Sequence, residues 1–123
     1  MAFRQLSMLA AVITFGLMAV LMLVPGVLFW LFQIESNASV EVFARRASML
    51  FLFASAITFL FRDLAPGRHQ RDIAIAVSMM MGGLAIVGFV EFLLGRVGPG
   101  IFLAIATEIG FIALFVPYVR QKV

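Results

Sequence analysis

The stretch VFARRASMLFLFASAITFLFRD, residues 42–63, decides the fold of this chain. Only the fifteen uncharged residues 47–61 separate Arg46 from Arg62. A helix that crosses a bilayer usually needs about 20 predominantly apolar residues. The stretch therefore spans a membrane only if Arg45 and Arg46 lie partly within it, where an unpaired charge is costly.

The composition of the whole chain is that of an integral membrane protein. Of its 123 residues, 64% are hydrophobic and 12% are charged, whereas soluble domains average about 25% charged residues. The first apolar run is longer than the roughly 7–15 residues of a signal-peptide core, so we do not expect it to be cleaved. The absence of cysteine excludes disulfides and thiolate metal sites. A net charge of +3 is too small to indicate nucleic-acid binding.

Four apolar stretches predict four transmembrane helices, at about residues 6–32, 40–61, 73–94 and 100–119. Twenty residues at 1.5 Å each already span the roughly 30 Å of hydrocarbon in a bilayer. The connections are short, which makes successive helices antiparallel. We therefore expect one all-α domain over residues 1–123, an antiparallel four-helix bundle. Pro25-Gly26 predicts a kink in the first helix.

The distribution of basic residues predicts the orientation of this bundle. Six lysines and arginines lie on the side that holds both chain ends, and three lie on the other side. Cytoplasmic segments are richer in these residues, so both termini should be cytoplasmic. Trp30 and Tyr118 suit the two aromatic belts. The residues expected at lipid headgroups and interfaces are Arg46, Arg62, Arg68, Arg71, Trp30 and Tyr118.

The two adjacent arginines of the opening stretch point in different directions on a helix. Arg45 shares its face with Ser48 and Ser55, and this polar face should point into the protein. Arg46 shares its face with Leu50 and other large apolar residues, so it should reach outward to the headgroups.

An inward Arg45 needs an acidic partner, and Glu91 and Glu108 are the candidates. Both lie in the outer half of the bilayer under the expected topology. Such a cluster has two interpretations: an ion pair that fixes helix packing, or a site for protons or substrate. The predicted polar cluster comprises Arg45, Glu91, Glu108, Ser48, Ser55 and Thr107.

Small residues in the third and fourth helices predict close helix–helix contacts, since they let backbones approach in lipid. They are Gly82, Gly83 and Gly88, followed by Ala106 and Gly110. Their contacts could lie within the bundle or with another subunit.

The chain offers few groups for catalysis or cofactor binding. Its single histidine, His69, lies in a loop, so an intramembrane haem or metal site lacks its usual ligand. We find neither a phosphate-binding loop nor a nucleophile–base arrangement. The expectation is a non-enzymatic protein without metal or cofactor.

The order PGVLFWLF (25–32), ARRASMLFLFASAITFLFRD (44–63) and GRHQRDIAIAVSMMMGG (67–83) resembles small four-helix proteins of bacterial inner membranes. The resemblance implies the same fold and location but no particular activity. We expect an accessory or structural subunit that packs against a larger membrane complex (respiratory, photosynthetic or transport) or against itself, in contact with membrane lipids. The alternative is a small oligomeric proton- or ion-coupled carrier that uses Glu108 and Arg45.

Overall fold

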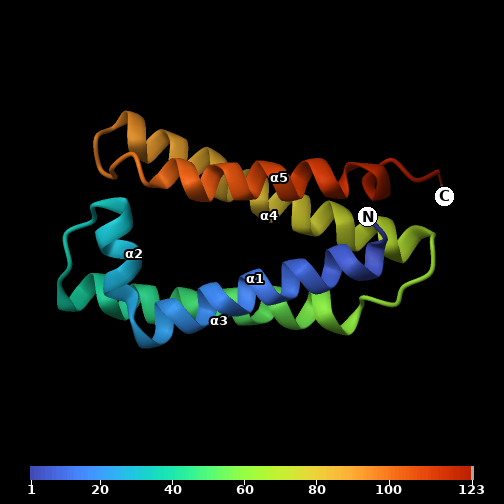
Figure 1. Ribbon diagram of the computed structural model, residues 1–123, viewed down its shortest axis with the longest axis horizontal. Helices are drawn as coiled ribbons and strands as arrows, with labels where there is room; N and C mark the ends of the chain where they lie inside the picture. Colours follow the sequence, from blue (N-terminus) through green and yellow to red (C-terminus); the bar gives the residue numbers. More distant parts are fainter. Residues whose placement is uncertain (123) are drawn as a thin grey trace.

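The computed structural model describes residues 1–122, which form five helices (Figure 1). Four of these helices are long and apolar enough to cross a membrane. Within residues 1–122 there is no strand. The predicted all-α class is therefore confirmed, and the four long helices agree with a multi-pass membrane protein. The helices are α1 (Phe3–Leu23), α2 (Pro25–Phe32), α3 (Ala38–Leu60), α4 (Arg68–Leu93) and α5 (Ile101–Val119).

The first predicted helix is broken at Pro25, and the expectation of one continuous helix over residues 6–32 is wrong. Val24 adopts φ −138° and ψ 60°, which ends α1, and Pro25 begins α2. Proline has no N–H to donate and its ring clashes with the preceding turn. Here the chain breaks instead of bending, and α2 turns sharply away from α1 (Figure 1). The 21 residues of α1 still cover roughly 30 Å, so α1 is long enough to cross a membrane without α2.

The third long helix begins earlier than its apolar residues do. It starts at Arg68, directly after Gly67 (φ 150°), and so adds more than one polar turn to the predicted 73–94 segment. Apolarity marks only the part of a helix that meets lipid, which is why the polar turn was missed.

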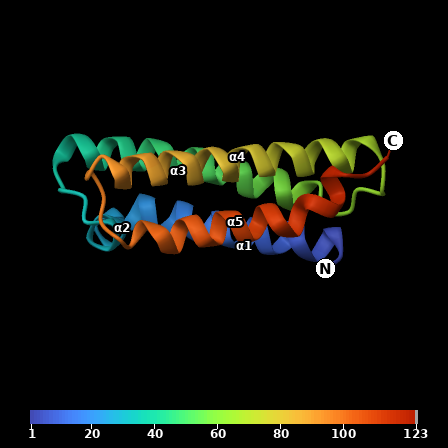
Figure 2. The same cartoon turned by 90° about the horizontal axis from the view of Figure 1, so that it is seen from above.

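The four long helices form two pairs, α1 with α3 and α4 with α5 (Figures 1 and 2). In the first pair the contact consists of small and hydroxyl side chains, and the Ser55 hydroxyl donates to the carbonyl of Ala11 at 2.8 Å. Such residues let two backbones approach closely in lipid. The buried residues of the two helices include Ser7, Ala11 and Thr14 in α1 and Ala44, Ser48, Ser55 and Thr58 in α3.

The second pair also meets through small residues. A methyl group added at Gly88 would lie 3.2 Å from Cγ1 of Ile101, closer than an ordinary contact. A methyl group at Gly82 would lie 3.8 Å from Cδ1 of Ile112. Gly82 and Gly88 of α4 thus both lie against isoleucine side chains of α5.

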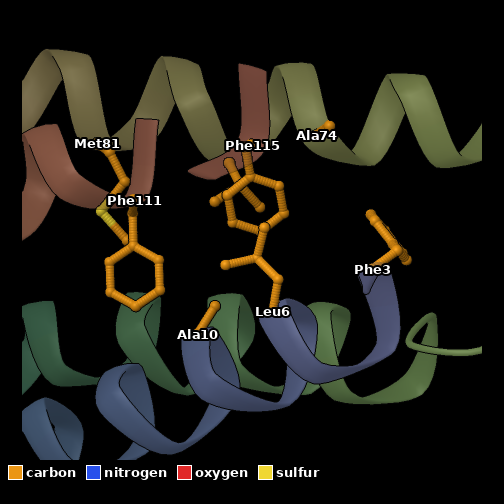
Figure 3. Close-up of a cluster of buried hydrophobic side chains, with 8 residues drawn as sticks. Phe3, Leu6, Ala10, Ala74, Met81, Phe111 and Phe115 are labelled. Atoms are coloured by element: carbon orange, nitrogen blue, oxygen red, sulfur yellow. The ribbon is translucent and has the colours of Figure 1, made fainter. Parts of the chain in front are cut away.

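One cluster of buried hydrophobic side chains from α1, α4 and α5 holds the two pairs together, and it includes residues close to both chain ends (Figure 3). Phe3 packs edge-on against Phe115 and Tyr118, with ring centroids 6.4 and 5.2 Å apart. The Tyr118 hydroxyl also donates to the carbonyl of Met1. The cluster comprises Phe3, Leu6, Ala10, Ala74, Val77, Met81, Phe111 and Phe115.

A polar network closes the same end of the molecule. Gln70 is only 4% exposed. Its Nε2 donates to the carbonyl of Leu64 at 2.9 Å, and its Oε1 accepts from Gln121 Nε2 at 2.6 Å. Gln121 in turn accepts from the Gly67 N–H at 3.0 Å. The α3–α4 connection and the segment after α5 are thereby tied to the start of α4.

At the opposite end, α2 joins the two pairs. The Gly98 N–H, in the α4–α5 connection, donates to the carbonyl of Phe32 at 2.7 Å. A methyl group added at Gly100 would overlap the backbone carbonyl of Leu31. Only glycine permits this close approach of the two backbones.

Candidate functional site

Arg45 does not turn toward Glu91 or Glu108, so the predicted interhelical ion pair is wrong. Its side chain is 48% exposed, and its Nη1 lies 3.9 Å from Oε2 of Glu41. Its Nε donates to the carbonyl of Met22 at 3.3 Å. Arg45 can bind the Met22 carbonyl because α1 ends at Leu23, and the last carbonyls of a helix lack hydrogen-bond partners within that helix. The break at Pro25 thus offers Arg45 a backbone acceptor on the neighbouring helix.

Glu91 has a local partner instead of Arg45. Its Oε1 lies 3.3 Å from Nη1 of Arg96, and the Arg96 N–H donates to the Glu91 carbonyl at 3.0 Å. Both residues lie where α4 ends and the chain turns toward α5. The pair therefore stabilises a turn and contributes nothing to the space between the helical pairs.

Glu108 lies alone in the membrane-spanning part of α5. It precedes Phe111 and Phe115 by three and seven residues, so it shares their inward face. Seven residues from Ile101 place it about 10 Å into the helix. Its Oε2 is buried, and within residues 1–122 it has no hydrogen-bond partner. A lone ionised carboxylate at this depth costs on the order of 3 kcal/mol, so it must be protonated or covered by something beyond these residues.

The hydroxyl residues of the predicted cluster are also separate. Ser48 donates to the Arg45 carbonyl and Ser55 to the Ala11 carbonyl, both in the contact between α1 and α3. Thr107 is exposed on α5 and donates to the Leu103 carbonyl at 3.0 Å. Each hydroxyl thus satisfies a backbone acceptor, and no shared polar site forms from the six predicted residues.

Two buried serine hydroxyls lie outside the predicted polar cluster. The hydroxyls of Ser7 on α1 and Ser78 on α4 have no hydrogen-bond partner within residues 1–122. Ser7, Ala11 and Thr14 are spaced four and three residues apart, as are the small residues Ala106, Gly110 and Ala113 of α5. The same criterion applied to the first helix would have found this contact surface.

Three of the predicted helix-packing residues face outward. Gly83, Ala106 and Gly110 are exposed, and a methyl group added at Gly83 or Gly110 would meet nothing within 4 Å. Ala113 lies on the same side of α5 as Ala106 and Gly110, and it is exposed as well. The other residues of the described range 1–122 therefore leave these three positions uncovered. We call Ala106, Gly110 and Ala113 the small face of α5.

The residues predicted at interfaces lie near the ends of the helices. Trp30 is 79% exposed on α2. Arg46 is exposed beside Phe43 and Leu50. At the other end, Arg68 and Arg71 flank Asp72 at 3.8 and 4.0 Å, Arg62 follows α3, and Tyr118 closes α5.

The two ends of the molecule differ in charge. The end with the chain termini carries six basic and two acidic residues, a net charge of +4, and the other end carries three of each. The first group is Arg4, Arg62, Arg68, Arg71, Arg120 and Lys122 with Asp63 and Asp72, and the second is Arg45, Arg46 and Arg96 with Glu35, Glu41 and Glu91.

Within residues 1–122, histidine and acidic side chains form no group of three that could hold a metal ion. Comparison with known protein families, curated proteins and solved structures finds no match to this chain. The residues themselves therefore carry the functional argument. The two features that call for a partner are the unpaired Glu108 and the uncovered small face of α5.

Proposed function

We propose that this chain is a non-enzymatic subunit of a bacterial inner membrane, an antiparallel four-helix bundle with both termini in the cytoplasm. It packs against a larger membrane complex (respiratory, photosynthetic or transport) or against copies of itself. The excess of positive charge at the end with the termini supports this orientation.

The observation that carries the proposal is the small face of α5. Of the most apolar part of α5, only 11% of the residues are buried within the chain. Small residues on a membrane helix are the usual surface for contact with another helix, because van der Waals packing drives association in lipid. Here that surface is left uncovered by α1, α3 and α4, which supports an intermolecular contact.

A bulky substitution on this face tests the proposal. Gly110→Leu adds a side chain where nothing lies within 4 Å, so the chain itself should fold unchanged. Association should weaken at least tenfold, measured as the fraction of assembled protein after purification in mild detergent. Gly16→Leu is the matched control, because Gly16 is also exposed and unobstructed, on α1. Equal assembly of both variants would contradict the proposal.

Cross-linking supplies a second, independent test. The chain has no cysteine, so a single Gly110→Cys substitution creates one reactive position. We expect it to cross-link in native membranes to a second copy or to one defined partner. Ile86→Cys, an exposed position on α4, should cross-link far less.

The second candidate function is a small, oligomeric proton- or ion-coupled carrier, and Glu108 is the observation in its favour. An intramembrane carboxyl group without a counter-ion is a natural proton carrier, since its neutral form is stable in lipid. Because Arg45 lies elsewhere, the carrier would depend on Glu108 alone.

Proton uptake into proteoliposomes separates the two candidates. A carrier should lose uptake in Glu108→Gln and retain it in Glu91→Gln, whose carboxylate pairs locally with Arg96. A subunit that works by association should show no uptake in the unsubstituted protein.

A further inference from the structure

A shallow groove of about 400 Å³ runs between α1 and α3 on the outer surface of that pair. Its floor contains Ala11 and Ser55, and the Ser55 hydroxyl is already bound to the Ala11 carbonyl at 2.8 Å. Its walls are exposed apolar side chains, which makes the groove suited to hydrocarbon. The lining residues are Met8, Ala11, Val12 and Phe15 of α1 with Leu52, Ser55, Ala56 and Phe59 of α3.

The groove ends at two arginines and one aspartate. Arg62 lies over the ring of Phe59, with its Cζ 4.1 Å from the ring centroid, and its Nη1 donates to the Phe59 carbonyl at 2.7 Å. Arg4 lies one turn before Met8 on α1, and its Nη1 is 2.5 Å from Oδ1 of Asp63. The Nε of Arg62 is 3.8 Å from the other oxygen of Asp63. The end of the groove thus carries a net positive charge, within the end of the molecule that carries +4.

The length of the groove corresponds to one leaflet of a bilayer. Leu52 of α3 lies ten positions before Arg62, and Phe15 lies eleven positions after Arg4 on α1. At 1.5 Å per residue, both intervals are about 15 Å, half of a roughly 30 Å hydrocarbon core. The lining residues therefore extend from the headgroup region to the middle of the membrane.

We propose that this groove binds an anionic phospholipid from the leaflet on the side of the chain termini. One acyl chain lies between Val12 and Ala56, and the phosphate contacts Arg62 and Arg4. Arginine suits this role because its guanidinium can bind two phosphate oxygens at once.

The dimensions favour a lipid over a helix from a second copy or another protein. A transmembrane helix would need a contact surface through the full thickness of the bilayer, whereas the lining of this groove covers one leaflet. The positive charge at one end and the apolar lining elsewhere match the two parts of a phospholipid. The proposal does not depend on the function proposed above.

Native mass spectrometry of the full, delipidated chain tests the headgroup part. Phosphatidylglycerol should bind as a single molecule, at least fivefold more tightly than phosphatidylcholine with the same acyl chains. Arg62→Gln should weaken phosphatidylglycerol binding about fivefold, the effect expected for one basic residue near an anionic lipid. Arg68→Gln removes the same charge at the same end but away from the groove, and should change binding less than twofold. Equal losses in the two variants would overturn the proposal, because they would indicate general surface attraction.

Filling the groove tests the acyl-chain part. Ala56→Leu should weaken phosphatidylglycerol binding at least fivefold, whereas Ala76→Leu, at a similar distance from the same end on α4, should leave it unchanged. Val12→Ala, which removes part of one wall without adding bulk, should weaken binding about twofold and serves if Ala56→Leu does not fold. Undiminished binding in the folded variants, or displacement of lipid by a dimer that forms through this groove, would overturn the proposal.

Discussion

The two ends of the molecule hold the helical pairs together by different means. At the end with the chain termini, eight buried side chains from α1, α4 and α5 form a packed cluster. At the other end, α2 meets the α4–α5 connection through backbone contacts at Gly98 and Gly100. Between them, Glu108 is only partly buried. Side-chain packing therefore dominates one end and close backbone approach the other.

This comparison predicts the largest loss of stability for Phe115→Ala. Phe115 is fully buried in the cluster, and truncation of a buried phenylalanine costs about 3 kcal/mol in water-soluble cores. We expect a similar or slightly smaller loss of stability here. The truncation removes the same packing contacts, but the contribution from transfer out of water is smaller because the surroundings of a membrane helix are already apolar. Unfolding in mixed micelles by an increasing fraction of denaturing detergent measures it.

Phe102→Ala is the matched control for this first prediction. Phe102 is 40% exposed and packs edge-on against Phe92, with centroids 4.6 Å apart. Its loss should be about 1 kcal/mol. Equal losses for the two phenylalanines would contradict the packed cluster as the main contact between the pairs.

The contact at the α2 end is tested by Gly100→Ala. The added methyl group overlaps the backbone carbonyl of Leu31, which cannot move away as a side chain can. We expect a loss of about 2 kcal/mol from overpacking, by the same unfolding measurement. In Gly98→Ala the methyl group meets only the side chain of Gln33, which can rotate, so the loss should be smaller. A harmless Gly100→Ala would mean that α2 does not hold the two pairs together.

The polar network at the terminal end should contribute less than the cluster beside it. Gln70→Ala removes the hydrogen bonds to Leu64 and Gln121. Since each hydrogen bond contributes about 1 kcal/mol, we expect the free energy of unfolding to fall by about 1–2 kcal/mol. Faster proteolysis in the α3–α4 connection would report the same change locally. Gln5→Ala, whose side chain makes one exposed hydrogen bond, should change neither quantity.

The smallest effect is expected for Arg45→Gln. Arg45 is half exposed and its distance to Glu41 is 3.9 Å, so the loss should be at most about 1 kcal/mol. A buried ion pair with Glu108 would instead make the loss roughly 3–5 kcal/mol. The same unfolding titration distinguishes the two values.

The arrangement of charges shows what a helical wheel can and cannot predict. The wheel placed Arg45 on the face of Ser48 and Ser55, and those two serines are buried, but Arg45 itself is exposed like Arg46. The wheel also could not say which neighbour the polar face of α3 meets. That neighbour is α1, through Ser48 and Ser55. Arg45 consequently finds the Met22 carbonyl, an acceptor that exists only because α1 ends before Pro25.

Small residues show the same division. The small size of Gly82, Gly88 and Gly110 indicates helices that tolerate close approach. Gly82 and Gly88 of α4 lie against side chains of α5. Gly110 lies on the opposite side of its helix and faces outward. Period and residue size identify a possible contact surface, but not the helix that covers it.

The sequence by itself determined the all-α class, four helices long and apolar enough to cross a membrane, and Pro25 as the point where the first of them is disturbed. These follow from apolar length and from a missing N–H, both of which are local properties. Only the tertiary structure decided that the helices associate as two pairs, that Oε2 of Glu108 finds no hydrogen-bond partner within residues 1–122, and that α2 joins the pairs at one end. An apolar helix face can pack equally well against lipid or against another helix, so hydrophobicity does not determine which helices are neighbours in a membrane. The shapes of the side chains and the free backbone carbonyls determine it.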